Sequence, residues 1–146
     1  MIWTPRTTVA AVIEKNNRFL MVEEDIDGQM TLNQPAGHLE SGESLIEAVI
    51  RETQEETAWS FVPTDLVGIY RWQHTASDET YMRYCFTGEV NQHDENQALD
   101  EDIHQALWLS QQELLARQND FRSPLVLDCF NDYLNGQRYP LTILHN

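Results

Sequence analysis

The sequence predicts an α+β or three-layer domain, in which several antiparallel strands are combined with one long helix and further helices near the end. Three observations predict this class. Short stretches of β-branched and apolar residues, separated by turn residues, fill the first quarter of the chain. The apolar period changes to a helical one after Ser44, and serine-initiated helix starts recur toward the end. The length fits one domain, residues 1–146.

Strands are expected first at Thr7–Ile13, Arg18–Glu24 and Gln29–Asn33. A polar turn at Lys15–Asn17 separates the first two, and Asp27-Gly28 marks the next turn. The first part of the chain is therefore expected to consist of strands separated by turns.

A helix is expected after a loop over residues 34–42, which contains Pro35, Gly37 and Gly42. Ser44 and Glu47 form a capping box that starts the helix. The apolar residues that then recur at helical spacing are Leu45, Ile46, Val49, Ile50 and Thr53.

The rest of the chain predicts strands at Leu66–Gln73 and Tyr81–Val90, a polar loop at Asn91–Asp102, and a short strand at Leu107–Leu109. A second capping box, Ser110 with Glu113, starts a helix that runs to about Arg117. The last helix has Ser123 as its N-cap, Pro124 at its first position and Gly136 as its stop.

The composition limits the partners. The net charge of −15 disfavours a nucleic-acid polymer or an anionic membrane, since binding to either needs clustered Lys and Arg. A small anionic substrate remains compatible with this charge, because a divalent cation held by carboxylates would attract phosphates. Cys85 and Cys129 lack the spacing of a metal or redox pair and are expected to be partly buried thiols. We expect no signal peptide and no membrane span, and hence a cytoplasmic location.

The expected helix after Ser44 carries an unusual group of acids. At about 100° per residue, Glu52, Glu55 and Glu56 share an arc of roughly 100° that overlaps one edge of the apolar face. Carboxylates that merely solvate a helix lie opposite its apolar face. Three carboxylates this close repel one another, and a hard cation such as Mg²⁺ would relieve the repulsion. An ordinary acidic surface helix is the alternative interpretation.

The same segment resembles the signature of the Nudix family. That signature has Gly, five residues, Glu, seven residues, and then Arg-Glu, two residues and Glu-Glu. The chain supplies these positions with Gly37, Glu43, Arg51, Glu52, Glu55 and Glu56. Segments outside the signature resemble one bacterial phosphatase branch of the family: Asn33–Glu40, Arg122–Val126 and Gly136–Leu141.

The sequence also departs from the family pattern. Ala58 stands where the family has a closing Gly, and a left-handed conformation there would cost Ala roughly 1 kcal/mol. Thr53 and Trp59 occupy aliphatic positions, and Leu32 stands where Trp is expected. None of these changes removes a carboxylate.

The resemblance implies a mixed β-sheet sandwiched between helices, with the signature as a loop-helix-loop. It also implies a metal site for Mg²⁺, with Mn²⁺ as a substitute, formed by Glu52, Glu55, Glu56 and the carbonyl of Ala36. Arg51 would orient Glu55, while Gly37 and Glu43 would support the signature.

Catalysis by such a protein would use one further acid from a later loop, to bind metal or activate water. Glu101 is the candidate we name, with Asp100 and Asp102 as alternatives. The base would be Glu52 or one of these three. Arg83, and more weakly Arg6, are expected to bind substrate, with Arg83 pairing with a phosphate.

The branch resemblance implies a protein that releases orthophosphate from nucleoside tri- and diphosphates and from thiamine-pyrimidine pyrophosphate. A monomer is the default expectation, since the sequence leaves the oligomeric state open. Stacking on the substrate ring could come from several aromatic residues, namely Trp3, Tyr70, Trp72, Tyr81 and Tyr139. His38 and His74 could also face the pocket.

Alternatives remain open at this stage. One is a pyrophosphatase for ADP-ribose, NADH or dinucleoside polyphosphates. A second is a catalytically silent sensor that binds a nucleotide. A third is an acidic protein-interaction module.

Overall fold

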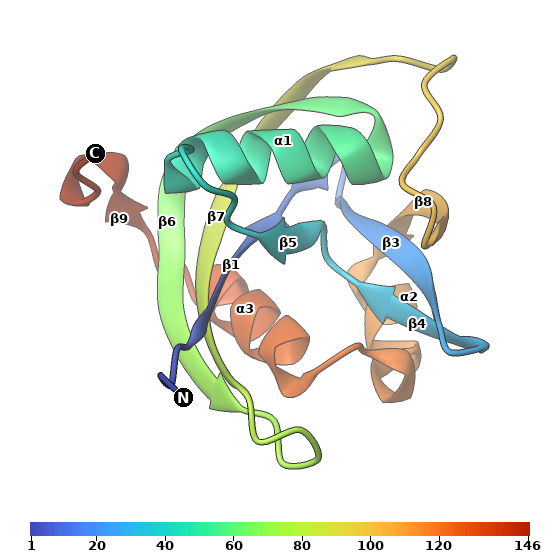
Figure 1. Ribbon diagram of the computed structural model, residues 1–146. Helices are drawn as coiled ribbons and strands as arrows, with labels where there is room; N and C mark the ends of the chain where they lie inside the picture. Colours follow the sequence, from blue (N-terminus) through green and yellow to red (C-terminus); the bar gives the residue numbers. More distant parts are fainter.

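A computed structural model describes residues 1–146 and arranges the strands in two sheets (Figure 1). The larger sheet has five strands in the order β5-β1-β7-β6-β9. Their bounds are β1 Arg6–Val12, β5 Ala36–His38, β6 Trp59–Gln73, β7 Thr80–His93 and β9 Tyr139–Pro140. β1 runs parallel to β7, whereas its pairing with β5 and the pairing of β6 with β7 are antiparallel, so this sheet is mixed.

The smaller sheet is antiparallel and centred on β3. β3 pairs with β2, β4 and β8. The strands of this sheet are β2 Glu14–Lys15, β3 Arg18–Ile26, β4 Gln29–Asn33 and β8 Ile103–Ser110.

Helices cover both sides of the strands (Figure 1). α1 (Leu45–Thr57) packs Ala48 and Val49 into one apolar cluster, which includes Val9 of β1. α3 (Pro124–Leu134) contributes Phe130 to a second cluster, which includes Val12 of β1. Side chains of β1 thus enter both clusters, as expected for a strand with helices on both faces. The predicted three-layer α+β class is confirmed, and the division into two sheets is an added detail.

The capping box predicted at the start of α1 is formed. The Ser44 hydroxyl accepts from the Glu47 amide at 3.1 Å, and the Glu47 carboxylate accepts from the Ser44 amide at 2.8 Å. The helix ends at Ala58, which is left-handed with φ 62° and ψ 14°. Ala58 therefore takes the conformation of the glycine that it replaces.

The helices near the end also begin where predicted. Ser110 and Glu113 form the second capping box, at the start of α2 (Gln111–Ala116). Ser123 caps α3 through the Leu125 amide at 3.3 Å. Two short 3-10 helices complete the chain, η1 at Gln118–Asp120 and η2 at Leu141–Ile143. None of the helices is long and apolar enough to cross a membrane.

Several strand boundaries differ from the prediction. β5 lies inside the expected loop over residues 34–42, and β7 continues to His93, inside the expected loop at Asn91–Asp102. β6 begins already at Trp59, which pairs with His93. β8 starts at Ile103, and β9 was not expected. These segments are strands because a neighbouring strand supplies their hydrogen bonds, and local sequence does not report such a partner.

Candidate active site

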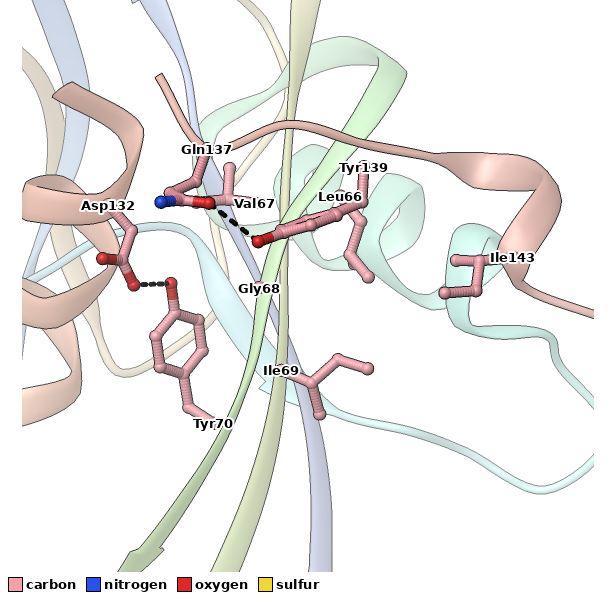
Figure 2. A pocket seen from close by; sticks show the side chains of 9 residues that line it. All are labelled: Leu66, Val67, Gly68, Ile69, Tyr70, Asp132, Gln137, Tyr139 and Ile143. Atoms are coloured by element: carbon pink, nitrogen blue, oxygen red, sulfur yellow. Dashed lines mark hydrogen bonds between the residues drawn. The ribbon is translucent and has the colours of Figure 1, made fainter. Parts of the chain in front are cut away.

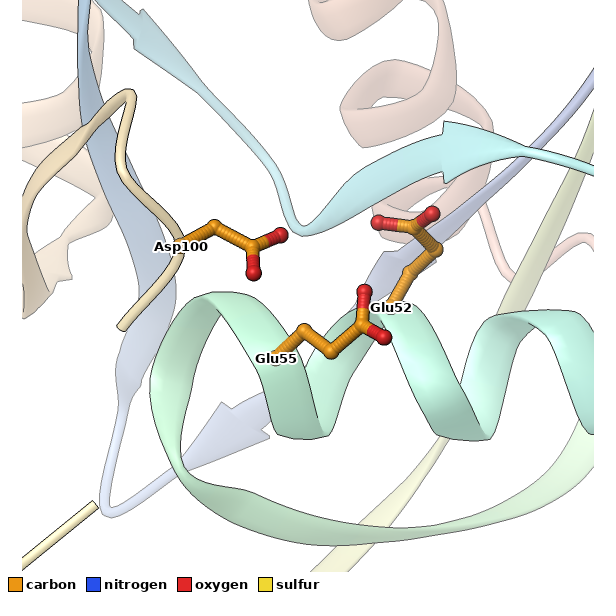
Figure 3. A group of neighbouring side chains, drawn as sticks. All are labelled: Glu52, Glu55 and Asp100. Atoms are coloured by element: carbon orange, nitrogen blue, oxygen red, sulfur yellow. The ribbon is translucent and has the colours of Figure 1, made fainter. Parts of the chain in front are cut away.

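The last turns of α1 face the loop that precedes β8, and carboxylates from both meet there. Glu52, Glu55 and Asp100 each offer an oxygen within 4.8 Å of the other two (Figure 3). The loop is fixed to the helix by its backbone, because the Asp100 amide donates to the Glu55 carbonyl at 3.1 Å.

Arg51 forms hydrogen bonds with three of the acidic side chains at this site. Its guanidinium donates to both oxygens of Glu43, at 2.7 and 3.0 Å, to Glu52 at 2.8 Å and to Glu55 at 3.1 Å. A further donation at 3.0 Å reaches the His38 carbonyl. Its hydrogen bonds lower the pKa of Glu43, which keeps that carboxylate ionised.

Glu52 lies against the backbone of Gly37. A Cβ atom built on Gly37 would stand 2.0 Å from the Glu52 carboxyl carbon, so only glycine leaves room for the carboxylate in this place. Glu52 is only 9% exposed. Burial raises the pKa of Glu52 to about 7, despite the opposing effect of Arg51.

Glu56 lies deeper than the other acids, 6% exposed, and accepts a hydrogen bond from the Ala36 amide at 2.9 Å. Burial raises the pKa of Glu56 well above its ordinary value, and the neighbouring charges of Glu24, Glu52 and Asp100 add to this effect. Several carboxylates therefore share a region in which their negative charge is poorly compensated.

A divalent cation fits this donor set. Carboxylate oxygens are hard ligands of the kind that Mg²⁺ prefers, and three come from two separate segments within 4.8 Å of one another. Burial is the main reason that the pKa values of Glu52 and Glu56 are raised, and repulsion from neighbouring carboxylates adds to it; a cation would offset that repulsion. Among the acids of the loop, the structure brings Asp100 to the group. Glu101, the candidate named from the sequence, is exposed and lies outside it.

A polar cavity of about 450 Å³ adjoins the acids, with Ala36 and Glu56 in its wall. Arg83 lies in the same wall and is only 7% exposed. Its guanidinium donates to Gln34 at 3.0 Å and makes no ion pair. Arg6 lies outside this wall, more than half exposed, and pairs with Glu79 at 3.0 Å.

The aromatic candidates separate into three groups. Trp72, Tyr81, His38 and His74 line the polar cavity. Tyr70 and Tyr139 instead line a different, largely apolar hollow between β6, β9 and α3, where they bond to Asp132 and Gln137 (Figure 2). Trp3 is 69% exposed near the start of the chain and lines neither. Two of the five predicted stacking residues are thus placed for a ligand beside the acids.

Comparison with known proteins agrees with this geometry. A family model described as NUDIX domain matches residues 4–129, which is most of the chain. The chain belongs to the Nudix family. Phosphatase NudJ of Escherichia coli strain K12 is 42% identical over 144 residues, covering 98% of this chain and 92% of that protein.

Solved structures agree with the fold. A NUDIX hydrolase from Nitrosomonas europaea superposes with a TM-score of 0.96 at 49% identity, covering 98% of this chain and 97% of that one. The MutT protein from Methanosarcina mazei Go1 shares the fold at 23% identity, with a TM-score of 0.73 over 93% of this chain and 98% of that one. The predicted family, the predicted resemblance to phosphatase NudJ and the predicted hydrolase class are therefore confirmed.

Sequence reasoning missed several residues of the cavity wall, among them Thr8, Glu24 and Asn33. Each lies on a strand and is buried despite its polar side chain. The available signal was a polar residue at an inward position of a strand, which the alternation of side chains could have indicated.

Proposed function

We propose that the protein is a Mg²⁺-dependent phosphohydrolase that releases orthophosphate from nucleoside tri- and diphosphates and from thiamine-pyrimidine pyrophosphate. The grouping of Glu52, Glu55 and Asp100 is the observation that carries the metal requirement. The 42% identity to a protein named phosphatase supports orthophosphate as the product. Mn²⁺ would substitute for Mg²⁺, since both take oxygen ligands.

The metal would be held by Glu52, Glu55, Glu56 and Asp100, with the Ala36 carbonyl beside them. When bound, Mg²⁺ supplies positive charge that offsets the phosphate oxygens and makes an attacking water more acidic. Glu52 or Asp100 would accept the proton of that water.

The remaining residues of the signature act by positioning. Arg51 holds Glu52 and Glu55 at 2.8 and 3.1 Å, so neither carboxylate swings away from the reacting group. Glu43 holds Arg51 in turn through both of its oxygens. Arg83 contacts substrate from the cavity wall.

The test is to measure orthophosphate, pyrophosphate and nucleoside monophosphate with Mg²⁺ across a set of substrates. The set contains nucleoside tri- and diphosphates, thiamine-pyrimidine pyrophosphate, ADP-ribose, NADH and diadenosine polyphosphates. Orthophosphate from the first three, lost in Glu55→Gln and Glu56→Gln, is the expected result. Glu101→Gln should keep the activity of the wild type.

Two other results would contradict the proposal. Nucleoside monophosphates from only the last three substrates would indicate a pyrophosphatase. Binding of nucleotide without turnover would indicate a sensor. The monomeric state, the single domain and the cytoplasmic location stay predictions.

A further inference from the structure

Four buried polar atoms without a hydrogen-bond partner belong to residues of the polar cavity beside Glu56. Only one other such side-chain atom occurs in the molecule, Oγ1 of Thr53. The four atoms are Thr8 Oγ1, Glu24 Oε1, Asn33 Oδ1 and Arg83 Nε. Their residues are between 5% and 8% exposed. A buried polar atom is costly to leave unpaired, so their concentration around one cavity indicates a ligand that bonds to them.

The chemistry of these atoms restricts the ligand. Glu24 Oε1 and Asn33 Oδ1 accept hydrogen bonds, whereas Arg83 Nε donates one. Oε2 of Glu24 lies 3.6 Å from the guanidinium of Arg122, whereas Oε1 of the same carboxylate has no hydrogen-bond partner. The Arg83 orientation is set by Gln34, which accepts from Nη1 at 3.0 Å and donates to the Ala11 carbonyl at 3.1 Å. The ligand must therefore present donors to two residues and an acceptor to a third.

The cavity also has an aromatic wall. Trp72 and Tyr81 line it and stack on each other, with centroids 5.7 Å apart and planes 28° apart. Tyr81 is fixed by the hydrogen bond from its hydroxyl to Glu79 at 2.8 Å. Such a wall suits a flat ring with an apolar face.

We propose that this cavity binds a heterocyclic ring that carries an exocyclic amino group, and that it selects for that group. The two N–H bonds of the amine would donate to Glu24 Oε1 and Asn33 Oδ1, and Arg83 Nε would donate to an acceptor on the ring. A ring with a carbonyl in place of the amine would point lone pairs at the Glu24 carboxylate, leaving buried atoms unpaired.

This inference rests on the proposed function, since it takes the ring of a phosphorylated substrate as the occupant. Glu56 and Ala36 line the same cavity, so the ring would lie directly beside the carboxylates. A substrate with a short linkage between ring and phosphate is thereby accommodated. The assignment replaces the expected pairing of Arg83 with a phosphate.

The test measures binding without metal, by calorimetry in the presence of EDTA, so that it does not depend on turnover. In each of two matched pairs a carbonyl replaces the amine, and the neighbouring ring nitrogen changes from an acceptor to an N–H donor: cytidine and uridine monophosphate, and adenosine and inosine monophosphate. The wild type should bind the amine of each pair at least tenfold more tightly. Glu24→Gln should reduce this preference to less than about threefold, because glutamine offers both a donor and an acceptor.

Glu23→Gln is the matched control, because Glu23 pairs with Arg117 at 2.8 Å and lies outside the cavity wall. It should keep the preference of the wild type. Equal binding within both pairs would overturn the proposal, and so would inorganic phosphate that binds the metal-free protein as tightly as cytidine monophosphate. The ligand pairs are compared in the wild type as well, so a variant that fails to fold leaves the proposal testable.

Failure of the proposed function has a separate signature. Selective binding of the amines by a protein that releases no phosphate with Mg²⁺ would support the cavity assignment and contradict the hydrolase proposal. Phosphate release without any preference between amine and carbonyl rings would do the reverse.

Discussion

At the scale of single residues, Arg51 joins the acids of the site to one another. It bonds to Glu43, Glu52 and Glu55 while its side chain is only 22% exposed. Arg51→Ala removes the cation and leaves three neighbouring carboxylates to repel one another. We expect a loss of about 2 kcal/mol in unfolding free energy, between the values of exposed and buried pairs. Urea denaturation measures it.

An exposed arginine provides the comparison. Arg18 pairs with Glu113 at 3.3 Å with both side chains more than half exposed. Arg18→Ala should change the unfolding free energy by less than about 0.5 kcal/mol. If both substitutions cost the same, the acids of α1 do not depend on Arg51.

A substitution at Gly37 should change the geometry of the site more than the stability of the fold. Gly37→Ala would place a methyl group 2.0 Å from the carboxyl carbon of Glu52. The end of a flexible side chain can move, so we expect the unfolding free energy to change by less than about 1 kcal/mol. Mg²⁺ affinity should nevertheless fall at least tenfold, because Glu52 leaves its place. Calorimetric titration measures this affinity.

Gly28→Asn is the control for this substitution. Gly28 has φ +83°, a conformation that asparagine tolerates, and no atom lies within 4 Å of a Cβ built on it. It should change neither stability nor metal affinity appreciably. A normal Mg²⁺ affinity in Gly37→Ala would show that the close approach of Glu52 does not matter for the metal.

The sequence predicted individual site residues unevenly. The acids of the helix were predicted because helical spacing alone places Glu52 and Glu55 on one side. Asp100 could not be chosen over Glu101, because the backbone of an irregular loop decides which side chain turns inward. Glu24 was missed for a related reason, since its place in the cavity wall depends on how strands of the two sheets come together.

At the scale of secondary-structure elements, the backbone at the end of α1 adopts a conformation that is strained for a residue with a side chain. Ala58 is 2% exposed and left-handed, with φ 62°. Ala58→Val should cost at least about 2 kcal/mol in unfolding free energy, because β-branched residues strongly avoid this conformation. Ala58→Gly should change it by less than about 0.5 kcal/mol, since relief of strain is offset by the lost methyl group and by chain entropy. Thermal or urea denaturation of both variants measures the difference.

A Val variant as stable as the wild type would contradict this expectation, because it would mean that the helix ends in another conformation.

The helix starts were easier to predict than this end. A capping box is local, so Ser44 and Ser110 could be recognised without any knowledge of the fold. β5 and β9 could not, because three- and two-residue strands exist only through pairing with β1 and β6.

At the scale of the whole molecule, the metal should contribute to stability. The protein carries a net charge of −15, and repulsion from Glu24, Glu52 and Asp100 adds to the cost of burying Glu56. A ligand that binds only the folded state stabilises it by about 2.7 kcal/mol at a hundred times its dissociation constant. For a domain of this size, that corresponds to a rise in Tm of roughly 5–10 °C. Thermal denaturation with and without saturating Mg²⁺ measures it.

An increase in Tm of the same size with Na⁺ at equal ionic strength would contradict a specific metal site, because general screening would then explain it.

The overall architecture was predictable from sequence, since apolar periodicity reports which elements are helices and strands. The division into two sheets was not, because it depends on which strands pair over long separations.

The proposed metal site combines Asp100 with the acids of α1, and Mg²⁺ titration by calorimetry tests this combination. The wild type is compared with Asp100→Asn and with Glu101→Gln, which removes the neighbouring charge outside the group. We predict at least a tenfold loss of affinity in Asp100→Asn and a change of less than twofold in Glu101→Gln. Equal affinities in all three proteins, or a loss confined to Glu101→Gln, would contradict the site described.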